Sequence, residues 1–382
     1  MENPFRYGEV VRGAHFAGRV REKAELAADI RSGQNVVLIS PRRYGKTSLV
    51  LEVLDGLGET VPHAYVDLLR VTSLDQLPGL LATAFAGMLP PVERALDALG
   101  RALRDLPLRP KFGMDRDGTP TVEFEPGAPP ADVARTLGQL LEWPARIANA
   151  RARRVAVVLD EFQSVVDLDP HLPATLRAVF QQQADVAHVF LGSKRHMLEQ
   201  LFTDEHEPMF RMAKAMPLGP LPRAEFAAFI GARLAATRSP IAEEAVARVL
   251  DLTGGHPHDT QELCYFLWAL AATGHVFPVP PDLVDRALDR VLDAESARFV
   301  ALWDRLRLPQ RAALAAVAAE PGVGVYGAAY RRRHRLGEPS SVERSVSRLA
   351  ALGVIEADPA VEGAYRVVDT FLPAWLRRLR RS

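Results

Sequence analysis

Residues 35–48 read Asn35-Val36-Val37-Leu38-Ile39-Ser40-Pro41-Arg42-Arg43-Tyr44-Gly45-Lys46-Thr47-Ser48. The first five residues are a short, mostly apolar run, which is typical of a strand buried on both faces of a parallel sheet. The residues from Lys46 to Leu54 then read as a helix. A strand, a turn and a helix form the context in which the G-x-x-x-x-G-K-[ST] pattern predicts a phosphate-binding loop.

This loop predicts a site for ATP and Mg²⁺. Backbone N–H groups and the positive end of the following helix would point at the β-phosphate. Lys46 is expected to reach the β- and γ-phosphates, and the Thr47 hydroxyl to ligate Mg²⁺. Ser40 stands where the pattern has glycine, so we expect the loop to begin in a conformation that serine tolerates. The residues expected to contact the nucleotide are Pro41, Arg42, Arg43, Tyr44, Gly45, Lys46, Thr47 and Ser48.

Two carboxylates, Asp160 and Glu161, end a second apolar run, Val155–Leu159. A parallel strand beside the strand of the loop would deliver Asp160 to the Mg²⁺ shell. Glu161 would then lie near the γ-phosphate and polarise water for in-line attack. The alternative is a pair that only caps a helix, since aspartate is favoured at an N-cap. The pair and the loop together favour the catalytic interpretation.

Three further positions are candidates for contacts with the nucleotide. Ser193 follows the strand candidate Ala187–Leu191 and is expected to contact the γ-phosphate or the attacking water, with a helix-capping role as an equal alternative. Arg211 is a candidate for stabilising charge on the phosphoryl group, against a surface or structural role. His256 lies in Thr253-Gly254-Gly255-His256-Pro257, where the glycines end one helix and the proline starts the next.

Apolar runs alternate with helical segments over the first 222 residues, which predicts an α/β fold with the parallel, doubly wound sheet of a P-loop NTPase. The strand candidates are Asn35–Ile39, His63–Leu69, Arg154–Leu159, Ala187–Leu191 and Ala215–Leu218. Lys111–Glu125 has the pattern of a hairpin turning at Asp115–Gly118. Ala131–Ala150 and Pro281–Leu292 are among the helix candidates.

The chain after Pro222 turns helical and then ends with two helices and an alternating segment, which is the layout of a winged helix-turn-helix. A basic stretch separates these two helices. We therefore expect three domains: a nucleotide-binding domain over 1–222, a helical lid over 223–300 and a winged helix over 301–382.

Composition limits the other possibilities. The 47 basic and 47 acidic residues cancel, so any nucleic-acid site must be a local patch. Cys264 is the only cysteine, which excludes an intramolecular disulfide and the cysteine spacings of zinc sites. The sequence has no run of about 18 apolar residues, so we expect no membrane partner and a cytoplasmic location.

The basic residues of the last domain suggest a partner. Residues 301–382 contain fourteen arginines against eight acidic residues, with clusters at Arg331–Arg335 and Arg377–Arg381. A basic winged helix suggests contacts with DNA phosphates. The alternatives are a solvated surface, a winged helix that packs on the ATPase as an internal switch, and a tail that binds acidic protein or RNA.

Taken together, these features resemble the archaeal-type ATPase family of the AAA+/STAND P-loop ATPases. The residues that carry the resemblance are Asn3-Pro4-Phe5, Phe16-Ala17-Gly18-Arg19, Ser40–Ser48, Leu159-Asp160-Glu161, Gly192-Ser193, Gly255-His256-Pro257 and Val368–Leu376. The resemblance implies that Phe16 and Arg19 line the adenine pocket, and that His256 and Pro257 sense the nucleotide from the lid. The family usually has glycine in place of Ser40 and Pro-Phe in place of Thr370-Phe371.

We therefore expect a molecular switch that binds ATP, hydrolyses it slowly with Mg²⁺, and couples the nucleotide state to a lid and a winged helix. A protein partner or self-association would accompany this role. One alternative is an ATP-regulated DNA-binding regulator or defence component. A second alternative, which Ser40 suggests, is a nucleotide binder with little turnover.

Overall fold

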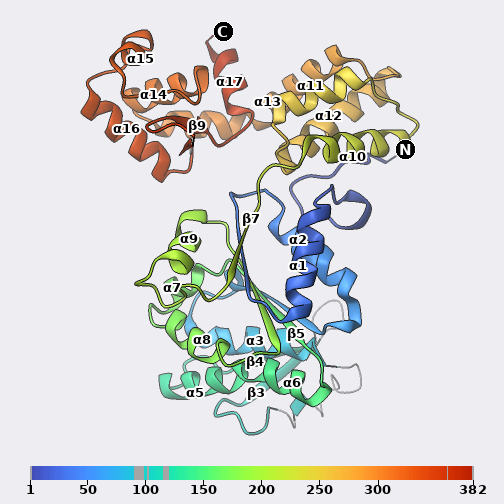
Figure 1. Ribbon diagram of the computed structural model, residues 1–382, viewed down its shortest axis with the longest axis vertical. Helices are drawn as coiled ribbons and strands as arrows, with labels where there is room; N and C mark the ends of the chain where they lie inside the picture. Colours follow the sequence, from blue (N-terminus) through green and yellow to red (C-terminus); the bar gives the residue numbers. More distant parts are fainter. Residues whose placement is uncertain (1, 90–98, 101–102, 115–119, 359, 381–382) are drawn as a thin grey trace. The chain divides into compact units, whose positions relative to one another are not determined.

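The computed structural model describes residues 2–89, 99–100, 103–114, 120–358 and 360–380 (Figure 1). The chain divides into two compact units, Val10–Gly219 and the combination of Met1–Glu9 with Pro220–Ser382. The segments predicted as lid and winged helix therefore belong to one compact unit, together with the first nine residues. No described helix has both the length and the apolar character needed to cross a bilayer.

Five parallel strands form the sheet of the first unit, in the order β2-β5-β6-β1-β7. Their bounds are β1 Val36–Ile39, β2 His63–Asp67, β5 Val155–Asp160, β6 Val186–Leu191 and β7 Lys214–Pro217. All five predicted strands are confirmed, with ends that differ by at most two residues. The prediction that the acidic strand lies beside the strand of the loop was wrong, because β6 lies between β1 and β5.

Helices cover both faces of this sheet (Figure 1). One face packs against α1 (Val20–Ser32) and α2 (Lys46–Leu57). The helices of the other face are α3 (Leu77–Ala86), α5 (Pro130–Leu141), α6 (Trp143–Arg151), α7 (Ser164–Leu168), α8 (Leu172–Phe180) and α9 (Arg195–Thr203). Every residue of β1, β5 and β6 is buried, which explains why these strands are almost purely apolar.

Two further predictions for this unit concern a hairpin and a helical segment. The hairpin exists, with β3 (Pro110–Met114) antiparallel to β4 (Pro120–Phe124), while its predicted turn at Asp115–Gly118 lies outside the described residues. The helical prediction over Ala131–Ala150 is confirmed, with an interruption at Glu142 that divides the segment into α5 and α6. Pro144 stands at the start of α6, where its missing N–H and its clash with the preceding residue favour a new helix over a continuous one.

The second unit is mostly helical. Its elements are α10 (Arg223–Ala236), α11 (Glu243–Thr253), α12 (Pro257–Gly274), α13 (Pro281–Arg305), α14 (Leu308–Ala319), α15 (Ala328–Arg333), α16 (Pro339–Ala351), β8 (Ile355–Ala357), β9 (Tyr365–Val367) and α17 (Leu372–Leu379). The helix predicted to end at Leu292 continues to Arg305, across the predicted boundary at residue 300, because Phe299 extends its buried face. Part of the basic stretch between the two predicted helices is itself helical, since Arg331–Arg333 form the last turn of α15.

Candidate functional site

The phosphate loop turns from β1 into α2 through two residues in the left-handed region. Arg43 has φ +65° and Gly45, the N-cap of α2, has φ +80°. A Cβ at Gly45 would meet no atom within 4 Å, so the backbone conformation, not lack of space, favours glycine there. Ser40 is not among the described residues with positive φ. The expectation that the loop begins in a conformation that serine tolerates is therefore confirmed.

Lys46 lies inside the loop, with 7% of its surface exposed. Its Nζ donates to the Ser40 carbonyl (3.1 Å), the Ser40 Oγ (3.2 Å) and the Pro41 carbonyl (2.9 Å). Burial lowers the pKa of Lys46 to about 8, although Asp160 and Glu161 act in the opposite direction. A phosphate that reached this ammonium would replace neutral acceptors with anionic ones and would favour its protonated form.

If the loop binds nucleotide, as the sequence predicts, this pKa makes the affinity for nucleotide depend on pH. Phosphate contact requires the protonated Lys46, and the free protein loses that proton as pH rises through about 8. We therefore expect the affinity for ATP to be constant well below this value and to fall by up to about tenfold per pH unit above it. Titration of a fluorescent ATP analogue at a series of pH values measures this. A Lys46→Arg variant is the control, because arginine stays charged and should show no such fall.

The side chains of Thr47 and Asp160 are in contact, although β1, which leads into the phosphate loop, and β5, which ends at Asp160, are not neighbours in the sheet. The Thr47 Oγ1 donates to the Asp160 Oδ2 at 2.8 Å, and the Asp160 Oδ1 accepts from the Glu161 N–H at 2.8 Å. Adjacent oxygen ligands of an octahedral Mg²⁺ lie about 2.9 Å apart when the bonds are about 2.0–2.1 Å long. A hydroxyl and a carboxylate at this spacing therefore have both the chemistry and the separation of two Mg²⁺ ligands.

Three hydrogen bonds converge on one carboxylate oxygen of Glu161. The Oε2 accepts from the Ser193 hydroxyl (2.7 Å), the Ser193 N–H (3.2 Å) and the Gln163 Nε2 (2.6 Å). The other oxygen, Oε1, receives none of these three bonds. The N-cap of α9 is Lys194 and that of α7 is Gln163, so Ser193, Asp160 and Glu161 are not the cap residues of these helices.

Sequence reasoning missed two residues of this site, Tyr65 and Gln163. The Tyr65 hydroxyl donates to the Asp160 Oδ2, and burial together with this hydrogen bond raises the pKa of Tyr65. Gln163 is 1% exposed, and a Cβ on Gly192 would lie 2.2 Å from its Oε1. Glycine is thus required at position 192 for the Gln163 amide to reach Glu161. The signal for Gln163 was its position two residues after the acidic pair, whereas Tyr65 had only its place on β2.

Arg19 joins three segments around the loop. Its buried guanidinium donates to Glu22 (2.9 Å), to the Tyr44 carbonyl (3.2 Å) and to the Gly219 carbonyl (2.7 Å). Arg19 itself has φ +59° at the N-cap of α1. These contacts give Arg19 a definite structural role beside the loop, and its predicted contact with adenine stays a prediction.

The segment before α1 is also fastened to α2. The Ser48 Oγ accepts a hydrogen bond from the Val11 N–H at 3.1 Å, so this hydroxyl makes a contact within the protein. Phe16 is half-buried, and the Lys23 ammonium lies 5.4 Å from the centre of its ring. The predicted contact of Phe16 with adenine likewise stays a prediction.

The other residues that were predicted to contact the nucleotide in this unit are exposed or half-buried. Arg42 and Arg43 are exposed on the loop, and Pro41 and Tyr44 are half-buried. Arg211 is exposed, has φ +56°, and places its guanidinium 5.0 Å from the ring centre of the preceding phenylalanine. Its predicted role toward the phosphoryl group stays a prediction.

His256 and Pro257 lie in the second unit, at the start of α12. His256 is the N-cap of this helix, and its Nδ1 accepts from the Asp259 N–H at 3.3 Å. Pro257 occupies the first helical turn, where its missing N–H costs nothing. The capping role expected for this segment is therefore observed, whereas nucleotide sensing stays a prediction.

Comparison with known proteins places this geometry in a fold. Residues 297–378 match the family model of a probable winged helix domain. The Walker-type ATPase PABY2304 of Pyrococcus abyssi is 16% identical, with 98% of this chain and 99% of that chain covered and a TM-score of 0.63. The ORC2 protein of Aeropyrum pernix in its ADPNP-ADP complexes is 15% identical, with 96% of each chain covered and a TM-score of 0.55.

A search of curated proteins gave no match. The structural likenesses lie below 20% identity, and they show the fold: the parallel sheet of a P-loop NTPase with a C-terminal winged helix. The resemblance that the motifs indicated is confirmed at this level.

Proposed function

We propose that this chain binds Mg-ATP and hydrolyses it slowly as a molecular switch. The observation that carries the proposal is the meeting of Thr47, Asp160 and Glu161 at the carboxyl ends of the strands, with Thr47 and Asp160 2.8 Å apart. Ligands of open α/β sheets bind at this edge. A chance Gly-Lys-Thr sequence would have no reason to face an acidic pair across an intervening strand.

Each residue has a defined task in this proposal. Lys46 supplies positive charge to the β- and γ-phosphates, and Thr47 and Asp160 hold the metal ion. Bound Mg²⁺ would neutralise charge on the phosphates. Glu161 accepts the proton of the attacking water through Oε1, because Ser193 and Gln163 already fix its Oε2.

The test is phosphate release by the purified chain with ATP, in the presence and absence of Mg²⁺. The proposal expects turnover that requires Mg²⁺ and is slow. ATP binding without detectable release would support the alternative of a nucleotide binder with little turnover. A chain that neither binds nor hydrolyses ATP would refute both.

The described state of the loop supports a switch. The Lys46 ammonium is satisfied by acceptors of its own loop, and the Glu161 carboxylate by donors on Ser193 and Gln163. Nucleotide can reach Lys46 only by replacing those loop contacts. Binding therefore exchanges one set of charge-assisted hydrogen bonds for another, which is the kind of local event that shifts a two-state element.

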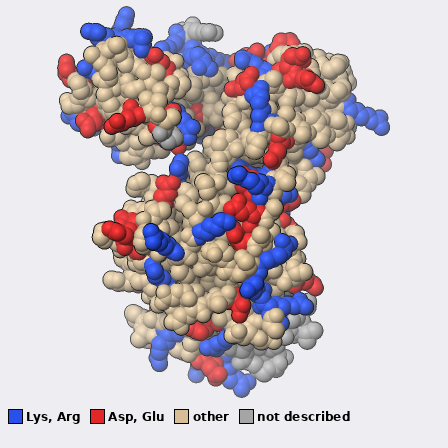
Figure 2. Space-filling view, in the orientation of Figure 1, with Lys and Arg blue, Asp and Glu red and all other residues tan. Residues whose placement is uncertain are grey.

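A second candidate function is ATP-regulated DNA binding through the winged helix. Figure 2 shows basic side chains gathered over α15, and residues 301–382 contain arginine but no lysine. Arg332 and Arg335 are exposed there, whereas Arg331 and Arg333 make contacts within the module. The Arg331 guanidinium donates to two backbone carbonyls, and Arg333 pairs with Glu320 through both its Nε and Nη2. The cluster predicted from sequence thus presents two of its arginines most freely.

The helix after this cluster also has basic side chains on its outer face. Arg344 and Arg348 are exposed on α16, while Val342 and Val346 are buried on its inner face. The second helix of a helix-turn-helix is the one that enters the major groove. Three arginines on consecutive helices, with Arg335 in the turn between them, offer positive charge to DNA phosphates, and this observation favours the second candidate.

If the module binds DNA, the double variant Arg332→Gln, Arg335→Gln should weaken binding uniformly across sequences. The slope of log affinity against log salt should become less steep by roughly 1.8, at about 0.9 for each lost phosphate contact. A mobility-shift titration at several salt concentrations measures both effects. The double variant Arg286→Gln, Arg290→Gln on α13 is the control, because it removes the same charge from exposed positions before the module. Negligible DNA affinity in the parent would exclude this function.

A further inference from the structure

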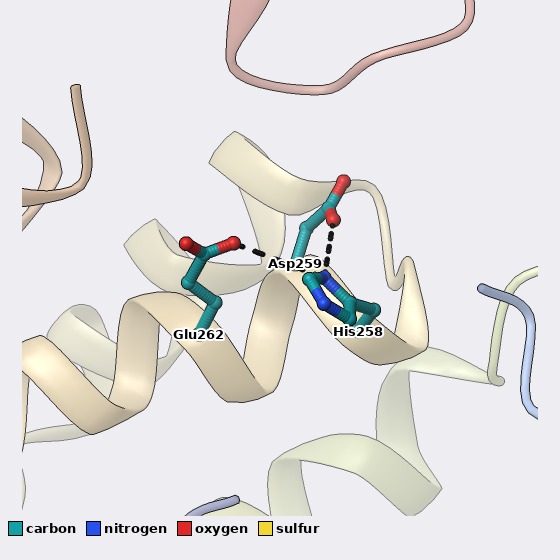
Figure 3. Close-up of side chains that lie close together, drawn as sticks. All are labelled: His258, Asp259 and Glu262. Atoms are coloured by element: carbon teal, nitrogen blue, oxygen red, sulfur yellow. Dashed lines mark hydrogen bonds and ion pairs between the residues drawn. The ribbon is translucent and has the colours of Figure 1, made fainter. Parts of the chain in front are cut away.

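A cluster of metal-ligating side chains lies on the first two turns of α12, and the proposed ATP chemistry does not use it (Figure 3). It consists of His258, Asp259 and Glu262. One ligand atom of each residue lies within 4.8 Å of those of the other two. In Figure 3 the imidazole stands between the two carboxylates, and dashed lines join it to both.

The spacing of the ligand atoms fits a small cation. The His258 Nδ1 lies 3.1 Å from the Asp259 Oδ1 and 3.8 Å from the Glu262 Oε2. Two ligands of a tetrahedral Zn²⁺ lie about 3.4 Å apart when the bonds are about 2.0–2.1 Å long. The two observed distances bracket this value, and the ligand atoms of Asp259 and Glu262 lie within 4.8 Å of each other, so side-chain movement on this scale would bring all three to one ion.

Burial gives the cluster a reason to bind a cation. Asp259 is 7% exposed and Glu262 is 2% exposed, and ionised carboxylates are costly to bury unless positive charge compensates them. The Nδ1 atoms of His256 and His258 lie 3.3 Å and 3.1 Å from oxygens of the Asp259 carboxylate. An imidazole compensates a carboxylate only when it is protonated, whereas a metal ion does so with the neutral ring.

We propose that His258, Asp259 and Glu262 bind one divalent transition-metal ion of the Zn²⁺ class. A ligand set of one imidazole and two carboxylates suits Zn²⁺ and its first-row neighbours, whereas Mg²⁺ and Ca²⁺ prefer oxygen ligands alone. Three protein ligands leave one tetrahedral position for water. The site is separate from the Mg²⁺ site proposed at Thr47 and Asp160, which belongs to the other compact unit.

Neighbouring side chains supply an outer shell. The Thr370 side chain hydrogen-bonds to Asp259, and the His256 Nδ1 lies 3.3 Å from the Asp259 Oδ2, the oxygen that does not face His258. The ring of Tyr7 packs edge-on against His258, with centroids 5.8 Å apart. The metal would thus brace α12 against the N-terminal segment and the turn before α17. Both segments contain residues that carry the family resemblance, Asn3–Phe5 in the first and Val368–Leu376 in the second.

The test is a Zn²⁺ titration of the full-length, nucleotide-free, chelator-treated protein in competition with a chromophoric chelator. We expect the parent to bind one equivalent. Loss of an outer-shell partner typically costs roughly 10–100-fold in metal affinity, so Thr370→Val should fall in that range and His258→Asn and Glu262→Gln should lose at least as much. His206→Asn should bind like the parent, because this histidine is exposed at 87% of its side chain.

Co²⁺ substitution gives an independent measurement. The parent should show the intense visible bands of four-coordinate Co²⁺ without a sulfur charge-transfer band, since Cys264 is not a ligand. Parent protein that binds no stoichiometric Zn²⁺ overturns the proposal, whether or not the variants fold. Equal loss of Zn²⁺ in His206→Asn and His258→Asn overturns it as well, because binding would then not depend on this cluster.

Discussion

The Glu161→Gln variant is expected to bind ATP with the affinity of the parent and to hydrolyse it about 10²–10⁴-fold more slowly. The amide cannot accept the proton of the attacking water, while its oxygen can still accept the hydrogen bonds that Ser193 and Gln163 donate to the carboxylate. The substitution therefore removes the chemistry and keeps most of the geometry. Phosphate release under saturating Mg-ATP, with affinity measured separately, distinguishes these effects.

Substitutions of two other carboxylates, Asp167 and Asp160, show whether the effect is specific to Glu161. Asp167→Asn is the control, because Asp167 is an exposed acid of α7 and should leave turnover unchanged. Asp160→Asn should instead raise the Mg²⁺ concentration needed for half-maximal turnover, because it removes a charged ligand. Parental turnover in both Glu161→Gln and Asp160→Asn would show that the acidic pair has no catalytic role.

The Lys46→Ala variant is expected to lose about 10²–10⁴-fold in ATP affinity. The ammonium would make two charge-assisted hydrogen bonds, to the β- and γ-phosphates, at about 1.5–3 kcal/mol each. Together they correspond to roughly 3–6 kcal/mol, which is the stated range in affinity. Titration with a fluorescent ATP analogue measures the loss.

Folding must be checked in this variant, because the Lys46 Nζ also holds the carbonyls of Ser40 and Pro41. Thermal unfolding of the nucleotide-free protein serves that purpose. Lys111→Ala is the matched control, since it removes one ammonium from an exposed position of the β3–β4 hairpin. Unchanged affinity in a folded Lys46→Ala protein would mean that the nucleotide binds elsewhere.

The sequence was most informative where local chemistry sets the structure. The run Val36–Ile39 is buried on both faces, the helix begins at Lys46, and the left-handed Gly45 stands at the position that the motif requires. Ser40 could be judged correctly for the same reason, because the preference of serine for negative φ is local. Each of these features depends on residues a few positions apart.

The order of the strands in the sheet could not be predicted from the sequence. No residue of β1 or β5 indicates that β6 lies between them, because a strand that is buried on both faces can pair with any apolar strand on either side. Tyr65 looked like an ordinary strand residue until β2 paired with β5, which places it opposite Val158 and two residues from Asp160 in the partner strand. The interruption at Glu142 was not predicted, although proline in the first turn of a helix, here Pro144, is a local signal for a helix start.

The single guanidinium of Arg19 has a mechanical consequence. It grips the Tyr44 carbonyl on the phosphate loop and the Gly219 carbonyl at the last residue of the first compact unit. The next residue, Pro220, opens the stretch that belongs to the other unit. A displacement of the phosphate loop would therefore act, through one side chain, on one of the two places where the chain passes between the units. If the loop binds a triphosphate, a movement of the loop would reach Gly219 through Arg19 without passing through the sheet.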